Sequence, residues 1–534
     1  MKYQNPEECL RAIEDLPMDQ PATVQTILQD MLSTLAAVHP EAEAHLEVLE
    51  ACRAPLDTVQ ELAALKYAEL PLPPDSLQNE TLLMVVSLWQ LMAHSYAQVD
   101  RRAQKDDVLG SQQPLLVQRH LFYTGQAIFE YFRSHRALPP GRWARLHQGF
   151  LNAEERNIAH VRVPDPLNPV WHAQSPLEAF TAALLVDLGN PFGRSAQEFR
   201  WMCRWAQRLA PYCRLLPTNP ENIGTETQGA AYGLNLGTDN GLRPLSVLQP
   251  NESLRRFEGS ELANQFHAIL NQFKQGVQPA ALGLGDDCPQ ETGARLLLSL
   301  YRPWGLGSVG RRFPRRGAEG DVEMTGDWFL IGYHIDNSSL DAQQGGGHVV
   351  ADDLSEGLPL DAEGFNCEHW QLINRSVSGL RLRMRPQKER LIHQQLVALR
   401  PPGFAHFLLG QISWLMFRDD GILEAGVMLL SESPRLISYR HIQVPEHGEP
   451  YVSLTYRQAF WLPKDRTSRQ PETLIFQPGQ CVPGDTIIVE DGSRTWRARI
   501  DRRLIIGPNF EQFSYVWQDV PETDNVSASG ATTV

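Results

Sequence analysis

The stretch WQLINRSVSGLRLRMR, residues 370–385, decides the fold of the C-terminal half. In its second half, apolar residues alternate with Arg381, Arg383 and Arg385. Alternation with a period of two predicts a β-strand with one apolar face and one row of guanidinium groups. Such a row is also found on strands whose arginines are simply solvated.

The first half of the same stretch carries an Asn-x-Ser-x-x-Gly pattern formed by Asn374, Ser376 and Gly379. It places an amide and a hydroxyl beside a predicted strand, and the glycine permits a bend or a close approach of another backbone. By itself the pattern is also typical of an ordinary turn.

An arginine-rich stretch, GRRFPRRG, precedes the strand at residues 310–317. Arg311, Arg312, Arg315 and Arg316 stand between two glycines, which predicts a mobile arm. Guanidinium groups pair bidentately with phosphate and with the O6/N7 edge of guanine. The alternative interpretation is a solvated surface or a contact with a protein partner.

In this order, and followed by β-patterned sequence, the two stretches resemble the PilZ family. Its members are bacterial β-barrel domains that bind cyclic di-GMP through an Arg-x-x-x-Arg arm and an Asp/Asn-x-Ser-x-x-Gly strand. The resemblance covers about residues 300–445 and includes GQISW at 410–414 and LEAGVMLL at 423–430. It leaves two registers for the arginine pair, Arg311 with Arg315 or Arg312 with Arg316.

The resemblance implies a role for each residue of the two stretches. One arginine of the arm would bind a phosphate and the other a guanine. Asn374 and Ser376 would hydrogen-bond a guanine edge or a phosphate, and Gly379 would keep the strand open. Arg381, Arg383 and Arg385 would add positive charge near the ligand.

The implied function is a cyclic di-GMP-binding effector that acts on a protein partner, through the helical region, in motility, attachment or exopolysaccharide control. The alternative is a PilZ-like scaffold that has lost the ligand and acts only through protein contacts.

The remaining patterns predict an α+β multidomain protein. Apolar residues at helical spacing predict helices at 21–39, 44–67 and 81–104, with Asp75 or Ser76 as an N-cap. We also expect a helix over 251–274, a strand over 322–335, and a hairpin around the Asp-Gly turn at 420–421. The first predicted domain is a helical region at 1–274, with bundles at 1–105 and 114–215 and a connecting segment at 216–274. A linker and short helix at 275–300 lead to a PilZ-like antiparallel β-barrel at 301–445, which contains an acidic, glycine-rich insertion at 336–369. Additional β-strands at 446–518 and a disordered tail at 519–534 follow.

Composition excludes several classes of protein. The 534 residues carry a net charge of −15, which argues against binding a nucleic acid polymer. No apolar run reaches the roughly 20 residues of a membrane span. The seven cysteines are scattered without a Cys-x-x-Cys pair, so we expect free thiols in the cytoplasm. No catalytic or metal-binding motif is present, so we expect neither an enzyme, a metal site nor a cofactor other than the ligand.

Overall fold

The computed structural model describes residues 2–218, 232–249, 251–305, 316–343, 367–386, 390–444, 449–464, 471–492 and 494–518, excluding the side chains of 337–343. The chain forms two compact units, Met1–Arg312 with Met416–Asp420, and Phe313–Leu415 with Gly421–Val534. Helices dominate the first unit and antiparallel β-structure the second, which confirms the α+β class.

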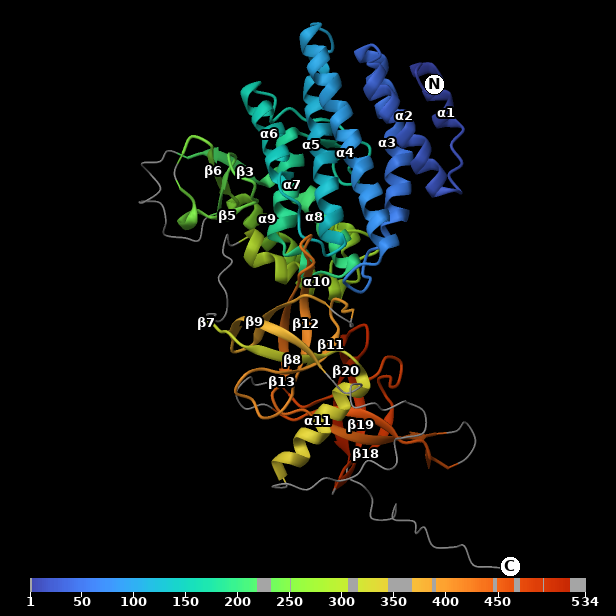
Figure 1. Ribbon diagram of the computed structural model, residues 1–534, viewed down its shortest axis with the longest axis vertical. Helices are drawn as coiled ribbons and strands as arrows, with labels where there is room; N and C mark the ends of the chain where they lie inside the picture. The colour runs from blue at the N-terminus through green and yellow to red at the C-terminus, as the bar shows by residue number, and fades with distance from the viewer. Residues whose placement is uncertain are drawn as a thin grey trace, which may run out of the picture. The chain divides into compact units, whose positions relative to one another are not determined.

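The first unit is built on long helices, of which α4 and α5 pack along each other (Figure 1). Apolar side chains of α5 contribute to two cores, one shared with α1–α4 and one with α6–α10, so α5 is the central element. The helices are α1 Pro6–Glu14, α2 Pro21–Val38, α3 Ala42–Ala64, α4 Ser76–Lys105, α5 Gln113–Arg133, α6 Arg142–Glu155, α7 Pro176–Leu188, α8 Ala196–Leu209, α9 Ser260–Lys274 and α10 Gln290–Leu300.

Helix α4 begins at the predicted N-cap. Asp75 Oδ1 accepts the Gln78 N–H at 2.8 Å, and Gln78 Oε1 accepts the Asp75 N–H at 3.0 Å. This reciprocal capping box satisfies two backbone donors that a helix start leaves free. The same arrangement starts α7 and α8.

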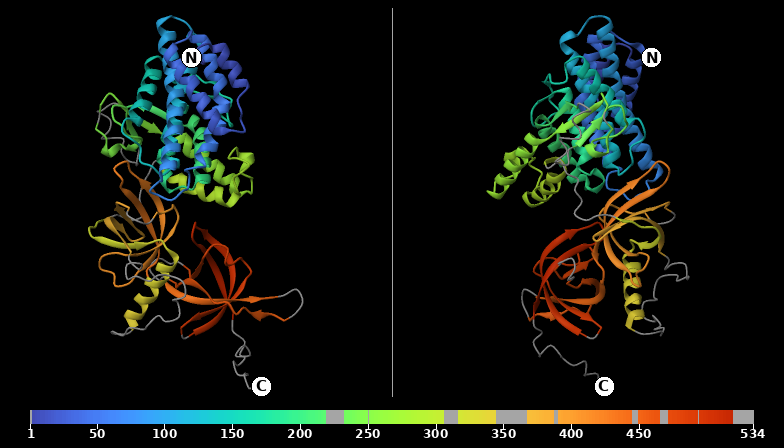
Figure 2. Two further views of the ribbon diagram at one scale, coloured as in Figure 1. Left: turned by 45° about the vertical axis from the view of Figure 1, so that its right-hand side comes forward. Right: turned by 90° about the vertical axis from the view of Figure 1, so that its left-hand side faces the viewer.

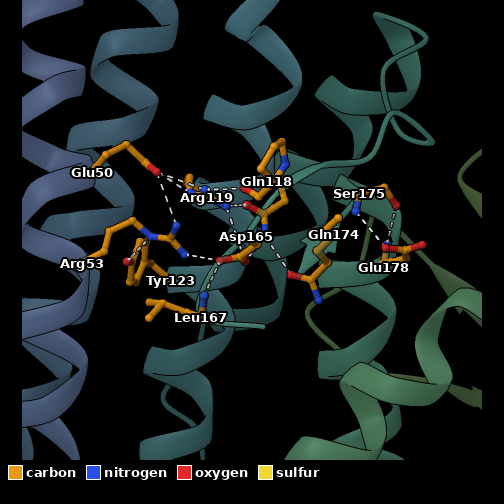
Figure 3. Close-up of polar contacts among 12 residues, drawn as sticks. Glu50, Arg53, Gln118, Arg119, Tyr123, Asp165, Leu167, Gln174, Ser175 and Glu178 are labelled. Atoms are coloured by element: carbon orange, nitrogen blue, oxygen red, sulfur yellow. Dashed lines mark hydrogen bonds and ion pairs between the residues drawn. The ribbon is translucent and has the colours of Figure 1, made fainter. Parts of the chain in front are cut away.

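A buried ionic network ties α3, α5 and a following loop together (Figure 3). Arg53 Nη2 lies 2.6 Å from Asp165 Oδ1, and Arg119 Nε lies 2.9 Å from Glu50 Oε1. Asp165 is fully buried and also accepts the Leu167 N–H at 3.2 Å. Burial acts to raise the pKa of Glu50, but hydrogen bonds and charge from Arg119 hold it below its ordinary value. Two buried cations therefore face two carboxylates, which offsets the desolvation of each group.

The segment 216–274 is more than a helical connection, which corrects the prediction. Four short strands form an antiparallel sheet in the order β3-β6-β4-β5, and α9 begins only at Ser260. Residues 254–258, predicted as helix, form β6 because they pair with both β3 and β4. The strands are β3 Arg214–Pro217, β4 Tyr232–Asn235, β5 Arg243–Pro244 and β6 Leu254–Glu258, and a separate two-stranded pair is formed by β1 Val163–Pro164 and β2 Ala173–Gln174.

The predicted linker and short helix at 275–300 contain α10, Gln290–Leu300, which confirms the helix, and part of the linker packs in the core. Leu282 and Leu284 are buried, and the Leu284 carbonyl accepts the indole N–H of Trp205 at 2.8 Å. Asp287 accepts a bond from Trp201 at 2.9 Å. The linker is therefore attached to α8 by Leu284 and Asp287, while other polar residues such as Gln275 and Asp286 are exposed.

The second unit begins with a closed barrel of six strands in the order β8-β9-β10-β13-β12-β11, with β11 pairing back to β8. The short strand β7, Arg316–Gly317, adds to the edge of β9. The predicted hairpin at 420–421 connects β12 and β13. The barrel strands are β8 Asp321–Thr325, β9 Glu368–Ser376, β10 Gly379–Met384, β11 Leu396–Arg400, β12 Leu408–Phe417 and β13 Leu423–Ser431.

The predicted strand at 322–335 is wrong beyond residue 325. Helix α11, Trp328–Gln343, begins where Asp327 Oδ1 accepts the N–H groups of Phe329 and Leu330. Ile331 and Ile335, four residues apart, are buried, while Phe329 is 69% exposed. Because α11 continues to Gln343 and β9 starts at Glu368, the predicted insertion at 336–369 is helical at its start and a strand at its end; 344–366 lie outside the described residues.

The strands predicted at 446–518 form a second closed six-stranded barrel, shown from two sides in Figure 2. Its order is β14-β16-β17-β20-β19-β18, with β18 pairing to β14. Strand β14 lies within the range predicted for the first barrel but pairs in the second. The strands are β14 Arg435–Gln443, β15 Tyr451–Val452 (on the edge of β14), β16 Arg457–Leu462, β17 Thr473–Phe476, β18 Thr486–Asp491, β19 Arg494–Ile506 and β20 Glu511–Gln518, and the predicted tail at 519–534 lies outside the described residues.

One apolar cluster joins the two barrels. It contains Ile331 of α11, Leu409 of the first barrel and Phe460 of the second. Asn509 also donates to the carbonyls of Gly326 and Leu396, both at 3.2 Å. The two barrels therefore form one unit. None of the described helices has the length and apolar character needed to cross a membrane.

Candidate ligand-binding site

The Asn-x-Ser-x-x-Gly pattern forms the hairpin between β9 and β10. Ser376 ends β9, Gly379 begins β10, and the two are strand partners across the turn Val377-Ser378. The Ser376 hydroxyl donates to the Gly379 carbonyl at 3.2 Å, which closes the turn. Its oxygen keeps acceptor capacity for a ligand.

Gly379 is required by packing. A Cβ at this position would lie 2.4 Å from the carbonyl oxygen of Val427 on β13. No side chain fits at that distance, so the glycine permits the close approach of two backbones that the sequence predicted.

Asn374 stands next to an irregularity in β9. Its strand partner is Arg381, whereas Leu372 pairs with Leu382, so Ile373 is an extra residue on β9. Such a bulge changes the direction in which the following side chains point. The Oδ1 atom of Asn374 is buried and has no hydrogen-bond partner among the described residues. A buried acceptor without a hydrogen bond lowers the stability of the fold by about 1–3 kcal/mol, and a donor on a bound ligand would restore that free energy.

The arginine-rich stretch reaches the hairpin through β7. Arg316 is the strand partner of Arg375, and Gly317 is the partner of Asn374. Partners on adjacent strands share a face of a sheet, so Arg316 shares its face with Arg375 and not with Asn374. Arg311, Arg312 and Arg315 lie outside the described residues.

Arg381 lies on the same face of the sheet as Asn374, and its guanidinium group already contacts two other side chains. Its Nε and Nη2 donate to Glu424 Oε2 at 3.2 and 2.5 Å, and its guanidinium lies 5.8 Å from the ring centre of Trp414. Glu424 is 3% exposed. A Cβ on Gly426 would lie 1.8 Å from Trp414 Nε1, so Gly426 makes room for the indole.

The side chains of Arg383 and Arg375 each contact one neighbouring side chain. Arg383 Nη2 donates to Gln371 Oε1 at 3.1 Å, and Arg375 lies 4.6 Å from the ring centre of Phe404. The structure therefore brings Asn374, Ser376, Gly379 and Arg381 together at one end of the barrel.

Sequence reasoning missed Glu424, Trp414 and Arg375. Glu424 and Trp414 belong to stretches on which the resemblance rests, but their contact with Arg381 depends on the pairing of β10 with β13. No local pattern predicts that pairing.

One group of described residues has the donor types of a metal site. Ligand atoms of His441, Cys481 and Asp485 in the second barrel all lie within 4.8 Å of one another. Burial raises the pKa of Cys481 to about 12 and lowers that of His441 below its ordinary range. A metal ion would have to displace the thiol proton.

Comparison with protein families connects both ends of the chain to one receptor. Residues 7–220 match the model described as cyclic-di-GMP receptor FimW, N-terminal domain, and residues 451–517 match the FimW C-terminal beta-barrel domain. The hairpin at 374–381 lies between the matched segments, and neither description names PilZ. Neither a curated protein nor a solved structure matches the chain.

The two matched segments together span more than half of the 534 residues, in the order that one receptor requires. They include the α1–α8 region and most of the second barrel, so both compact units are represented. The expectation of a cyclic di-GMP receptor is thus confirmed at the level of the family, and the chain belongs to the FimW family of cyclic di-GMP receptors.

Proposed function

We propose that this protein binds cyclic di-GMP at the β9–β10 hairpin of its first barrel, as a PilZ-like receptor. The observation that carries the proposal is the pairing of β7 with β9, because it brings the end of the arginine-rich stretch beside Asn374. The family membership supports the ligand, and the geometry supports its location.

Each group would recognise a different part of the ligand. Asn374 Oδ1, an acceptor without a partner among the residues that the structure describes, suits the N–H donors of a guanine edge. Arginines of the arm would pair with a phosphate and with guanine O6/N7. Because Arg316 shares its face with Arg375, we favour Arg311 with Arg315 as the binding pair over Arg312 with Arg316.

The test is isothermal titration of the full chain with cyclic di-GMP, beside GTP and cyclic GMP. We expect selective, saturable binding that is lost in Arg311→Ala/Arg315→Ala and in Asn374→Ala/Ser376→Ala. The matched control is Arg499→Ala/Arg502→Ala, two exposed arginines of β19 in the second barrel. Unchanged affinity in the first two variants would contradict the location.

The receptor would pass the signal to a protein partner, without catalysis, in motility, attachment or exopolysaccharide control. Exposed apolar side chains on the helical unit support a partner surface there: Leu65 is 68% exposed and Leu77 71%. The seven cysteines, all among the described residues, form no disulfide, which supports a reducing compartment such as the cytoplasm.

One observation favours the second candidate, a scaffold without ligand. Arg381 donates twice to the buried Glu424, so its charge is compensated within the protein. No heat and no thermal stabilisation with cyclic di-GMP at about 100 µM would support the scaffold.

A further inference from the structure

A cleft lies in the helical unit, between helices α4, α5 and α6, remote in sequence from the hairpin. Its volume is about 420 Å³, within the range of small-molecule sites. The lining residues recur at helical spacing, for example His94 and Arg101 on α4 and Arg142 and Arg145 on α6. Each helix therefore presents one continuous face to the cleft.

The cleft is basic although the chain carries a net charge of −15. Arg101, Arg142 and Arg145 line it, and among the described residues none of the three has an ion-pair partner. The one carboxylate in the lining, Asp100, is occupied by two bonds from Arg156 at 2.8 and 3.1 Å. A cleft with uncompensated guanidinium groups concentrates anions.

Two donors in the lining are buried without a partner among the described residues. They are Arg142 Nε and Gln90 Nε2. Both belong to residues that line the cleft, although the Arg142 guanidinium also lies 5.5 Å from the ring centre of Tyr131. Native proteins pair nearly all buried polar atoms, so these two donors lack an acceptor that a ligand reaching them could supply. Phosphate and carbonyl oxygens are acceptors of this kind.

The floor of the cleft is apolar, with one polar group. Val117, Ala127 and Ile128 of α5 line it and are nearly fully buried. His120 donates its Nδ1–H to the Ala93 carbonyl at 3.0 Å, and burial lowers its pKa. The neutral ring keeps Nε2 as an acceptor, so His120 and Gln90 offer one acceptor and one donor, as the edge of a nucleobase requires.

We propose that this cleft is a second ligand site, which binds a mononucleotide with its phosphate at Arg101, Arg142 and Arg145 and its base on the α5 floor. Through this site the helical unit would bind a nucleotide independently of the barrels. The inference does not depend on where cyclic di-GMP binds.

The test is isothermal titration of the full chain with 5′-GMP, with inorganic phosphate and cyclic di-GMP as competitors. Arg101 and Arg145 are exposed and have no ion-pair partner in the described part of the chain, so Arg101→Ala/Arg145→Ala should fold normally, which an unchanged Tm without ligand would verify. Arg200→Ala, an exposed arginine on α8, is the matched control. We expect at least about tenfold weaker 5′-GMP binding in the double variant only, since each lost charge-assisted bond changes affinity by about that factor.

Binding of 5′-GMP must also persist in Asn374→Ala/Ser376→Ala, which separates this cleft from the hairpin. Absence of binding at about 1 mM, or equal affinity in the Arg101/Arg145 variant, would overturn the proposal. Equal competition by inorganic phosphate, or displacement by cyclic di-GMP in the Asn374/Ser376 variant, would also overturn the assignment to a mononucleotide.

Discussion

Gly317 of β7 is the strand partner of Asn374 of β9. The two residues belong to stretches that the α11 helix and the acidic segment separate in sequence. Their pairing brings the end of the arginine-rich stretch beside the Asn-x-Ser-x-x-Gly hairpin, as the proposed site requires. It also predicts which glycines of the site are replaceable.

Gly379→Ala should lower the free energy of unfolding of the second unit by about 1–3 kcal/mol, because the new Cβ would meet the Val427 carbonyl oxygen. Gly317→Ala is the control, since nothing lies within 4 Å of its Cβ position. Urea denaturation monitored by tryptophan fluorescence measures both. Equal losses in the two variants would contradict the close approach of β10 and β13.

Asp165→Asn should destabilise the helical unit by about 3 kcal/mol, since it removes the charge closest to the buried guanidinium of Arg53 and leaves only Glu50, at 3.4 Å, to compensate it. Asp286→Asn replaces an exposed carboxylate of the same unit and should change little. Thermal denaturation followed by circular dichroism at 222 nm reports the helical unit. A shift in Tm no larger than that of Asp286→Asn would contradict a stabilising role for the network in Figure 3.

Acidification should destabilise the helical unit through His45. Burial, and then the charge of Arg102, lower the pKa of this histidine to about 4. Arg102 Nη2 donates to His45 Nδ1 at 2.7 Å, which requires the neutral ring. The folded state therefore binds the proton less readily than the unfolded state, so stability is complete above pH 6.5 and falls as the pH drops toward 4, by up to about 3 kcal/mol.

His45→Gln keeps an acceptor for Arg102 but removes the titrating group. The decline in the free energy of unfolding between pH 7 and 4.5 should become smaller in this variant, and the exposed His160→Gln should follow the wild type. An unchanged decline in His45→Gln would assign the acid sensitivity to other groups.

Arg381 and Glu424 should show coupling in a double-mutant cycle. Glu424→Gln leaves the guanidinium without its charged partner, and Arg381→Met removes it. We expect the double variant to lose less stability than the sum of the single variants, by about 1 kcal/mol, as neighbouring groups do. Additive losses of stability would mean that Arg381 and Glu424 do not interact, so that the guanidinium of Arg381 would be available to a ligand.

Local sequence patterns were sufficient to predict most helices, an N-cap at Asp75 or Ser76 and the strands of the second barrel. They failed at 328–335, where WFLIGYHI resembles a strand but forms α11, because the buried Ile331 and Ile335 follow a period of four. They also missed the packing of the predicted linker before α10, where Leu282 and Leu284 are buried and Asp287 contacts α8. In both places packing with distant elements decided the structure.

The candidate site was only partly predictable for the same reason. Asn374, Ser376 and Gly379 form a local pattern and could be named from the sequence. The bulge at Ile373, the partner of Arg381 and the face occupied by Arg316 depend on strand register. Register joins residues far apart in the chain, so no local pattern contains it.

The most direct test of the account is hydrogen–deuterium exchange of the full chain with and without saturating cyclic di-GMP. We predict slower exchange in peptides that cover residues 311–317 and 371–381, and no change in peptides of the second barrel. Binding of cyclic di-GMP without protection of 371–381 would contradict a site at the β9–β10 hairpin.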